Sequence, residues 1–336
     1  MNLYTKYFLR KSVWYFLTII IAISLNFFLP RFIRGNPVSV IVATLGQGMT
    51  DSNTQKKLYE TLMREFGLDK PIIVQYFIYL KNLVQGNLGT SFGLYPRSVT
   101  SILRSAIPWT IALQLPAILM GWILGNVLGA FAAYKKGLFD KTIFPAALFV
   151  SSVPFFALSI VLLYVFALNL GWFPIGGGYS YQMVPNLSLK FISSVLRHYT
   201  LPFLSIVIIT IGGQALGMRS MSIYELNTDY VLYSKLMGIR DSKIIFYVFR
   251  NAMLPQITGL ALSIGTMVSG ALITEIVFNY PGIGTWLFTA IRTLDYPLIS
   301  GCTLLIAAMV LVANFSIEII YGLVDPRVKS AQLEES

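Results

Sequence analysis

The sequence predicts an all-α integral membrane protein with six transmembrane helices. Of its 336 residues, 56% are hydrophobic and only 12% are charged, whereas a soluble domain carries about a quarter charged residues. So few charges cannot cover a water-facing surface, which excludes an ordinary cytosolic enzyme and a disordered chain. Six apolar stretches are long enough to cross about 30 Å of hydrocarbon as helices, and the alternation typical of barrel strands is absent.

The first stretch, Ser12–Pro30, follows three basic residues and resembles a signal peptide. It is longer than an ordinary signal core and no small-residue cleavage site follows it, so we expect a retained first span. Backbone groups cannot stay unpaired in lipid, so each span must be helical. The other five predicted spans are Ala106–Tyr134, Thr142–Leu170, His198–Met218, Leu254–Phe278 and Leu298–Tyr321.

The distribution of Lys and Arg predicts that both termini are cytoplasmic. With the N-terminus inside, the short outer loops contain only Lys190, Arg197 and Arg292. The inner segments contain Lys6, Arg10, Lys11, Lys135, Lys136, Lys141, Arg219, Lys235, Arg240, Lys243, Arg250, Arg327 and Lys329. The remaining basic residues lie in one outer segment longer than about 60 residues, where loop charge no longer sets orientation.

This topology divides the chain into residues 1–30, the N-terminal tail and first span, residues 31–105, an extracytoplasmic segment, and residues 106–336, a five-span core. A cytoplasmic loop occupies about 219–254. Within the outer segment, Leu58, Leu62 and Phe66 predict a helix that ends at Gly67. Ile72–Val84 is apolar but too short to span, so we expect it to lie in the interface or to cap the outer mouth.

The sequence offers no chemistry of its own. It has no Gly-Lys-Ser/Thr and therefore no P-loop, so the chain is not expected to hydrolyse ATP alone. A single cysteine, Cys302, and a single histidine, His198, exclude an internal disulfide and a Cys-rich or multi-His metal site. Gly176–Gly178 predicts a turn. We expect no catalytic residue, cofactor or metal, and we attribute the net charge of +11 to cytoplasmic loops rather than to nucleic-acid binding.

Several residues within the spans call for a structural or a functional interpretation. Glu275 and Glu318 lie near span ends, where they can reach water or a partner, and a structural or gating hydrogen bond is favoured over an ion relay. Pro116 and Pro154 can kink their helices. Glycines four apart let another backbone approach closely, in this chain or in a partner. Those span-packing residues are Gly121, Gly125 and Gly129.

The cytoplasmic loop is the most informative segment. Asn227 or Thr228 can cap a short helix that Gly238 ends. This helix would carry Tyr230, Tyr233, Leu236 and Met237 beside a few charges. Exposed aromatic and Met side chains favour a docking surface for another protein, although a helix lying on lipid headgroups is the alternative.

Motifs in this loop and elsewhere resemble the permeases of ABC importers, most closely the oligopeptide/dipeptide subfamily. The motifs are Gly67-Leu68-Asp69-Lys70-Pro71, Gln75-Tyr76, Gly86-Asn87-Leu88-Gly89-Thr90-Ser91, Asp229-Tyr230, Gly238, Arg250-Asn251-Ala252-x-Leu254-Pro255, Glu275 to Gly284, Asp295-Tyr296-Pro297 and Asp325-Pro326-Arg327. They cover nearly the whole chain in order. The chain departs from the family at Asn36 and Asn87, where Asp is usual, and at 232–237, where an Ala-rich stretch is usual.

The resemblance implies a type I ABC importer permease fold in the cytoplasmic (inner) membrane of a prokaryote. It implies a complex with membrane lipid around it: a second related permease, two ABC ATPase subunits that grip Asp229–Gly238, and an extracytoplasmic binding protein over Arg31–Ser105. The implied ATPase-coupling residues are Glu225, Asp229, Tyr230, Tyr233, Lys235, Gly238, Arg250, Asn251 and Pro255. The residues implied at the gate or outer mouth are Glu275, Pro281, Gly282 and Gly284.

The function that we expect is import of oligopeptides or dipeptides by alternating access, driven by ATP that the partner subunits hydrolyse. The same architecture could import oligosaccharides or nickel. A secondary transporter that works alone is less favoured, because no carboxylate is expected at mid-membrane.

Overall fold

A computed structural model describes residues 3–32, 35–45, 52–135, 137–270 and 272–324. The structure is 79% helical, and no strand occurs among these residues. The predicted tail motif at Asp325–Arg327, and the basic residues Lys136, Arg327 and Lys329, lie outside the described part, as does the side chain of Glu318.

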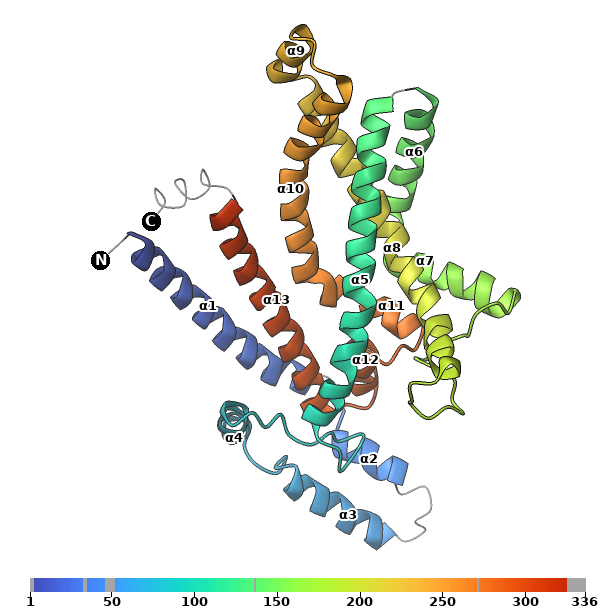
Figure 1. Ribbon diagram of the computed structural model, residues 1–336. Coiled ribbons are helices and arrows are strands. Elements are labelled where there is room, and N and C mark those ends of the chain that lie inside the picture. The colour runs from blue at the N-terminus through green and yellow to red at the C-terminus, as the bar shows by residue number, and fades with distance from the viewer. Residues whose placement is uncertain (1–2, 33–34, 46–51, 136, 271, 325–336) are drawn as a thin grey trace. The chain divides into compact units, whose positions relative to one another are not determined.

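The helices follow one another along the chain as Figure 1 shows. They are α1 (Leu3–Phe28), the 3-10 turn η1 (Leu29–Phe32), α2 (Pro37–Leu45), α3 (Ser52–Glu65), α4 (Ile72–Val84), α5 (Val99–Lys135), α6 (Leu138–Ser152), α7 (Phe155–Leu162), the π-helix η3 (Leu163–Asn169), α8 (Leu189–Leu226), α9 (Asp229–Leu236), α10 (Asp241–Gly270), α11 (Leu272–Val277), α12 (Ile283–Arg292) and α13 (Tyr296–Val324).

The described residues form two compact units. One takes residues from Met1–Trp109 and Gly282–Leu311, and the other takes residues from Thr110–Pro281 and Val312–Lys329. The boundary between them falls inside α5, inside α13 and at Pro281–Gly282. The division at residues 30 and 105 that the sequence suggests stays a prediction.

The N-terminal unit contains the segment after α1 that the sequence predicts to be extracytoplasmic. The helix expected around Leu58 and Leu62 is α3, and Gly67 ends it in a left-handed conformation with φ of +63°. A hydrophobic cluster in this unit consists of the buried side chains of Val38, Ile41, Leu62, Phe92 and Tyr296. Buried Asp295 immediately precedes α13. Its carboxylate accepts hydrogen bonds from the Ser91 hydroxyl and from the backbone N–H groups of Gly93 (3.0 Å) and Leu298 (3.1 Å).

The second unit is built around α8, which packs on α6, α7 and α10. α5 also lies against α8, because the glycine stripe of α5 faces its backbone. A Cβ on Gly121 would lie 3.1 Å from the Val207 carbonyl oxygen, and one on Gly125 would lie 2.8 Å from that of Ile211. The stripe therefore packs within the chain, which answers the question that the sequence left open.

The third predicted span, Thr142–Leu170, is not one continuous helix. α6 and the α7–η3 segment are bent by 98° relative to each other. Val153 is extended and Pro154 precedes the first turn of α7. Proline disfavours a helical conformation at the residue before it, so the kink foreseen at Pro154 is a full break. α5, in contrast, continues through Pro116.

The six predicted spans all fall on helices, but the count of six crossings stays a prediction. Within the described residues, α5 and α8 are long and apolar enough to cross a membrane, and the bent α6–α7–η3 pair would make a third. Shorter apolar segments occur at Phe16–Phe32, Ile72–Val84 and Tyr296–Val312. The predicted span Leu254–Phe278 covers parts of α10 and α11 on either side of residue 271.

Candidate functional site

The short helix α9 connects α8 to α10 and begins and ends as its sequence predicts (Figure 1). Thr228 occupies the N-cap position, although its hydroxyl donates to the Glu225 carbonyl (2.6 Å) instead of capping the helix. At the other end Gly238 has a φ of +70°. The N–H of Gly238 bonds the Lys235 carbonyl (3.0 Å) and that of Ile239 bonds the Ser234 carbonyl (3.1 Å), which is a Schellman C-cap.

One face of α9 is anchored to the helices on either side of it. Val231 is fully buried and forms a small core with Ile244 and Val248 of α10. Leu226, Tyr230 and Ile239 are packed around this core. Sequence reasoning did not single out Val231, although the i, i+4 pair of Ile244 and Val248 gave a signal for the apolar face that receives it.

The opposite face of α9 leaves large apolar side chains exposed. Leu236 is 74% exposed and Met237 is 78% exposed. Leu232 and Tyr233, four residues before them on the same face of the helix, are also exposed. We call these four side chains the apolar tip. A contiguous exposed patch of this kind on an otherwise anchored helix is a feature of interaction sites.

A polar network joins three helices beneath the apolar tip. The Tyr230 hydroxyl donates to Glu225 Oε2 (2.8 Å), and the Asn251 side-chain amide lies 3.5 Å from the same oxygen. Burial, and then the bond to Glu225, raises the pKa of Tyr230. Tyr230 therefore turns inward, which corrects its expected place beside Tyr233 on the exposed surface.

The remaining predicted coupling residues are at the surface. Asp229, Lys235, Gly238, Arg250 and Pro255 are all exposed. Pro255 lies inside α10 without ending it. The structure thus brings Glu225, Tyr230 and Asn251 together. The other predicted residues lie on α9 (Asp229, Tyr233, Lys235), at its C-terminal end (Gly238) and on α10 (Arg250, Pro255).

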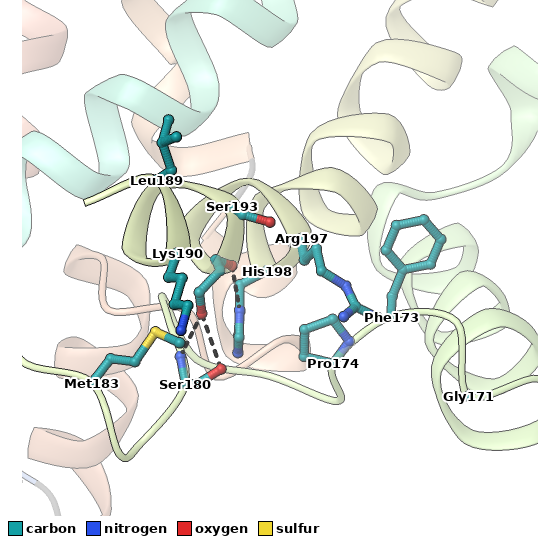
Figure 2. Close-up of a pocket in the computed structure, with 11 residues that line it drawn as sticks. Gly171, Phe173, Pro174, Ser180, Met183, Leu189, Lys190, Ser193, Arg197 and His198 are labelled. Carbon is teal, nitrogen blue, oxygen red and sulfur yellow. Dashed lines mark hydrogen bonds between the residues drawn. The ribbon is translucent and has the colours of Figure 1, made fainter. Parts of the chain in front are cut away.

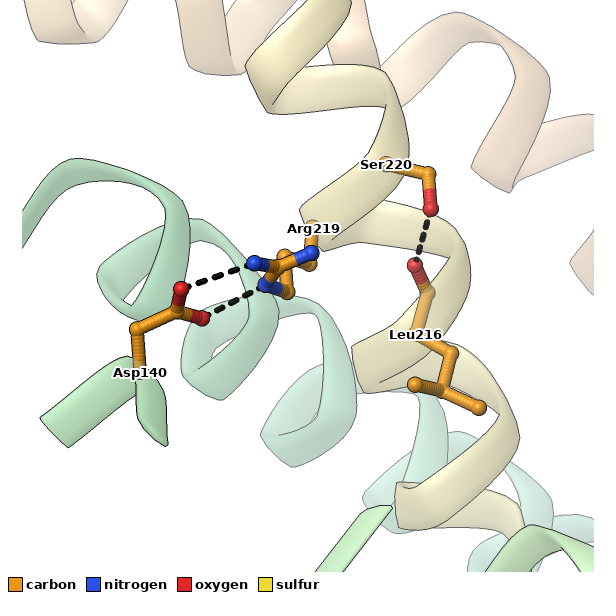
Figure 3. Close-up of polar contacts among 4 residues, drawn as sticks. All are labelled: Asp140, Leu216, Arg219 and Ser220. Carbon is orange, nitrogen blue, oxygen red and sulfur yellow. Dashed lines mark hydrogen bonds and ion pairs between the residues drawn. The ribbon is translucent and has the colours of Figure 1, made fainter. Parts of the chain in front are cut away.

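An ion pair that sequence reasoning missed joins α6 to α8 (Figure 3). Arg219 bonds Asp140 through two nitrogens, Nε to Oδ1 at 2.5 Å and Nη2 to Oδ2 at 2.7 Å. Its guanidinium also lies 4.4 Å from the centre of the Phe144 ring. The hydrogen bonds from Arg219 lower the pKa of Asp140, and those to Asp140 raise the pKa of Arg219.

Glu275 was expected near a span end, within reach of water or a partner, with a structural or gating hydrogen bond favoured over an ion relay. The structure differs in the position alone, because the side chain is completely buried. The Gln114 amide donates to Glu275 Oε1 (3.1 Å). Two residues after the end of α11, Asn279 has a φ of +45°, and the Tyr280 N–H bonds the Glu275 carbonyl (2.8 Å). The side chain therefore belongs to a buried hydrogen bond between α5 and α11.

The other residues predicted at the outer mouth lie where the chain passes from one unit to the other. Pro281 is half-buried, Gly282 is the N-cap of α12, and Gly284 is buried in its first turn. Their role in gating stays a prediction. Gly176 and Gly177, predicted as a turn, approach the end of α11, where Gly177 N–H bonds the Phe278 carbonyl (2.9 Å).

A hollow of about 640 Å³ lies between the loop after η3 and the start of α8 (Figure 2). Lys190, Arg197 and His198 of α8 line it. Arg197 donates to the Trp172 carbonyl (2.9 Å), and His198 Nδ1 is 2.7 Å from the Ser194 carbonyl oxygen. His198 is half-buried and engaged with its own helix.

Comparison with known proteins places these features in a family. Residues 125–330 match the family described as binding-protein-dependent transport system inner membrane component. The di/tripeptide transport system permease protein DppB of Pseudomonas aeruginosa is 33% identical over 324 residues, which cover 91% of this chain and 93% of the relative. A putative peptide permease protein of Brucella ovis is 36% identical over 275 residues, 80% of this chain and 84% of the relative.

The oligopeptide transport system permease protein AppB of Bacillus subtilis is 29% identical over 310 residues, 91% of this chain and 93% of the relative. The matches extend over nearly the full length of both chains, as the order of the sequence motifs suggested. The chain therefore belongs to the inner membrane components of binding-protein-dependent transport systems.

Proposed function

We propose that this chain is one permease subunit of an ATP-driven importer of di- and oligopeptides. The names of the similar permeases, which refer to dipeptides, tripeptides and oligopeptides, support peptides as the cargo. They favour peptides over the oligosaccharides and nickel that the same architecture could carry.

The observation that carries the proposal is the apolar tip of α9 on its anchored base. A helix designed to rest on lipid would bury its large apolar side chains in the bilayer beside a span. Here α9 lies between α8 and α10 in a polar stretch of the sequence that contains Asp229, Lys235, Arg240, Asp241 and Lys243. The tip fits a pocket on a cytoplasmic protein, and we assign that protein as an ATPase subunit.

The contacts of α9 with the helices on either side of it explain how force would reach the membrane. Val231 is locked to α10, and Glu225 on α8 accepts from Tyr230 on α9. A push on Leu236 or Met237 is therefore transmitted to α8 and α10 together. ATP binding would then favour one permease conformation because the ATPases hold the tip differently when they are closed.

The assembly that follows has four kinds of component. A second related permease completes the pathway, two ATPase subunits each hold one coupling helix, and an extracytoplasmic binding protein delivers peptide over residues 31–105. Both termini and α9 face the cytoplasm in this proposal. ATP is hydrolysed by the partners, since this chain has no P-loop.

A charge on the apolar tip tests the proposal. In proteoliposomes that contain the whole importer, Leu236→Glu should reduce peptide uptake and peptide-stimulated ATP hydrolysis at least tenfold, because a carboxylate cannot enter an apolar pocket without a large desolvation cost. Peptide binding to the binding protein should be unchanged.

The matched control is Ser242→Glu, which places the same charge on the same loop but at the exposed start of α10, where an acidic side chain favours the helix. It should transport normally. Uptake that survives L236E would overturn the coupling role of the tip, and uptake by the purified chain alone without ATP would establish the rival secondary transporter.

A further inference from the structure

A second pocket, in the N-terminal unit, has the composition of an anion site. It encloses about 390 Å³ between the end of α1, the helix α4 and the segment that precedes α5. Three cationic side chains, Arg31, Arg64 and Lys70, line it against one carboxylate, that of Glu65. Glu65 already accepts a hydrogen bond from the Tyr95 hydroxyl. The pocket therefore has a net positive charge.

Arg31 is held in place by neutral groups. Its Nη1 donates to the Phe27 carbonyl (2.6 Å), and Nη2 and Nε donate to Gln75 Oε1 (3.3 and 3.4 Å). The guanidinium lies 3.5 Å from the centre of the Phe27 ring. Burial lowers the pKa of Arg31 to about 10, and no carboxylate is among the causes of the shift. Arg31 is thus a charged, half-buried group, and two of its five N–H donors remain uncommitted.

Tyr79 supplies a second, independent feature. Its hydroxyl oxygen is buried and has no hydrogen-bond partner among the described residues. Burial raises the pKa of Tyr79, so the hydroxyl keeps its proton and can donate. A buried donor without a partner costs free energy unless something fills the site, and this one lines the same pocket as Arg31.

The helix α4 indicates what kind of anion the pocket meets. Gln75, Ile78, Tyr79 and Asn82 line the pocket from one face of this helix, at intervals of three and four residues. Ile73 and Phe77 are more than 60% exposed on other faces, and Val84 at the end is 89% exposed. At 13 residues, α4 is too short to span a membrane. A short apolar helix with a polar face is typical of the bilayer surface, at the depth of lipid phosphates, and the proposal assigns α4 to that position.

We propose that this pocket binds the phosphate of an anionic phospholipid headgroup, with the Arg31 guanidinium and the Tyr79 hydroxyl as its donors. Arg64 and Lys70 add long-range attraction at the rim. The exposed apolar side chains of α4 would lie among the acyl chains of the same lipid.

Lipid binding to the full-length chain, purified in detergent and stripped of lipid, tests the site. Native mass spectrometry with added phosphatidylglycerol should show a bound lipid on the wild type. Arg31→Gln should weaken this binding at least tenfold, because hydrogen bonds to charged groups are the strong ones. Tyr79→Phe should weaken it about threefold to tenfold, which corresponds to one lost neutral donor.

Two features keep the test decisive. Y79F removes only an unpartnered oxygen, so it should fold even where R31Q does not. Arg97→Gln removes the same charge from an exposed position of the same segment, outside the pocket, and should bind lipid as the wild type does.

A third arm distinguishes the source of the phosphate. Inorganic phosphate at millimolar concentration should compete only weakly with phosphatidylglycerol, because it lacks the acyl chains that α4 would contact. Phosphate binding that is sensitive to R31Q without any preference for phosphatidylglycerol would show that the site takes free phosphate, and the lipid assignment would be wrong. Equal lipid binding by R31Q, Y79F and R97Q would overturn the site itself.

Discussion

Arg219 and Asp140 are 79 residues apart in the sequence, and each looks like an ordinary loop charge when it is considered alone. In the fold they form a two-point ion pair, with each side chain 21% exposed. The planar guanidinium fits a carboxylate through two parallel hydrogen bonds, a geometry that Lys cannot copy. Arg219 therefore fixes the start of α6 to α8.

The pair should give the protein a measurable dependence on acid. The folded-state pKa of Asp140 is lowered, so its contribution to stability is present above the usual Asp pKa of about 3.9. The contribution is lost as the pH falls through the lower folded value. Asp140→Asn should lower the melting temperature at pH 7, by an amount equivalent to less than about 1 kcal/mol for a partly exposed pair.

Melting curves in detergent at several pH values between 7 and 3 would measure this effect. The difference between wild type and D140N should shrink toward pH 3. A difference that grows as the pH falls would contradict the assignment.

The sequence predicts the role of a side chain well when its partners are close in the chain and poorly when they are distant. Gly67 and Gly238 were predicted as helix ends because the left-handed conformation is a local requirement. Gln114 and Glu275 are 161 residues apart, and Ser91 and Asp295 are 204 apart. Their pairing depends on tertiary packing, and for that reason Glu275 was placed near water when it is in fact buried.

At the scale of elements, glycine spacing allowed a firm prediction. The period of four residues in α5 predicted a close helix contact, and the structure supplies α8 as the partner. The break at Pro154 shows the converse. A proline within an apolar run signals a kink or a break equally, and only the packing of α7 against α8 and α11 decides between them.

The helix contact predicts opposite effects for two glycine substitutions. A Cβ at Gly129 would meet the Ala215 carbonyl and the Arg219 N–H of α8, whereas a Cβ at Gly213 would meet nothing within 4 Å. Gly129→Ala should destabilise the protein by about 1–3 kcal/mol through overpacking. Gly213→Ala should stabilise it by about 0.5–1 kcal/mol, because alanine loses less backbone entropy in a helix.

Thermal unfolding of the two variants in the same detergent would measure both effects. Equal melting temperatures would mean that α5 and α8 are not in close contact at Gly129.

For the whole molecule, the proposed topology can be tested with the cysteine that the chain already has. Cys302 is fully buried and the sequence contains no other cysteine. The wild type should therefore not react with a membrane-impermeant maleimide added from either side of the membrane, and it serves as the unlabelled control. Lys235→Cys on α9 should react only when the cytoplasmic face is accessible.

Asn53→Cys on α3 should react only from the opposite face, because Asn53 is exposed and belongs to the segment proposed to be extracytoplasmic. Labelling of both positions from one side would overturn the topology. Labelling of K235C from outside would also remove the proposed contact with an ATPase.

The apolar tip has a consequence for the life of the protein in the cell. A copy made without its neighbours presents Leu232, Tyr233, Leu236 and Met237 to the aqueous phase, a signal that resembles unfolded chain to chaperones and proteases. Proteases would degrade copies made in excess of the other subunits, so the amount of the protein would follow the amount of its partners. The four exposed side chains that we propose to contact an ATPase subunit would then also mark a subunit made in excess for removal.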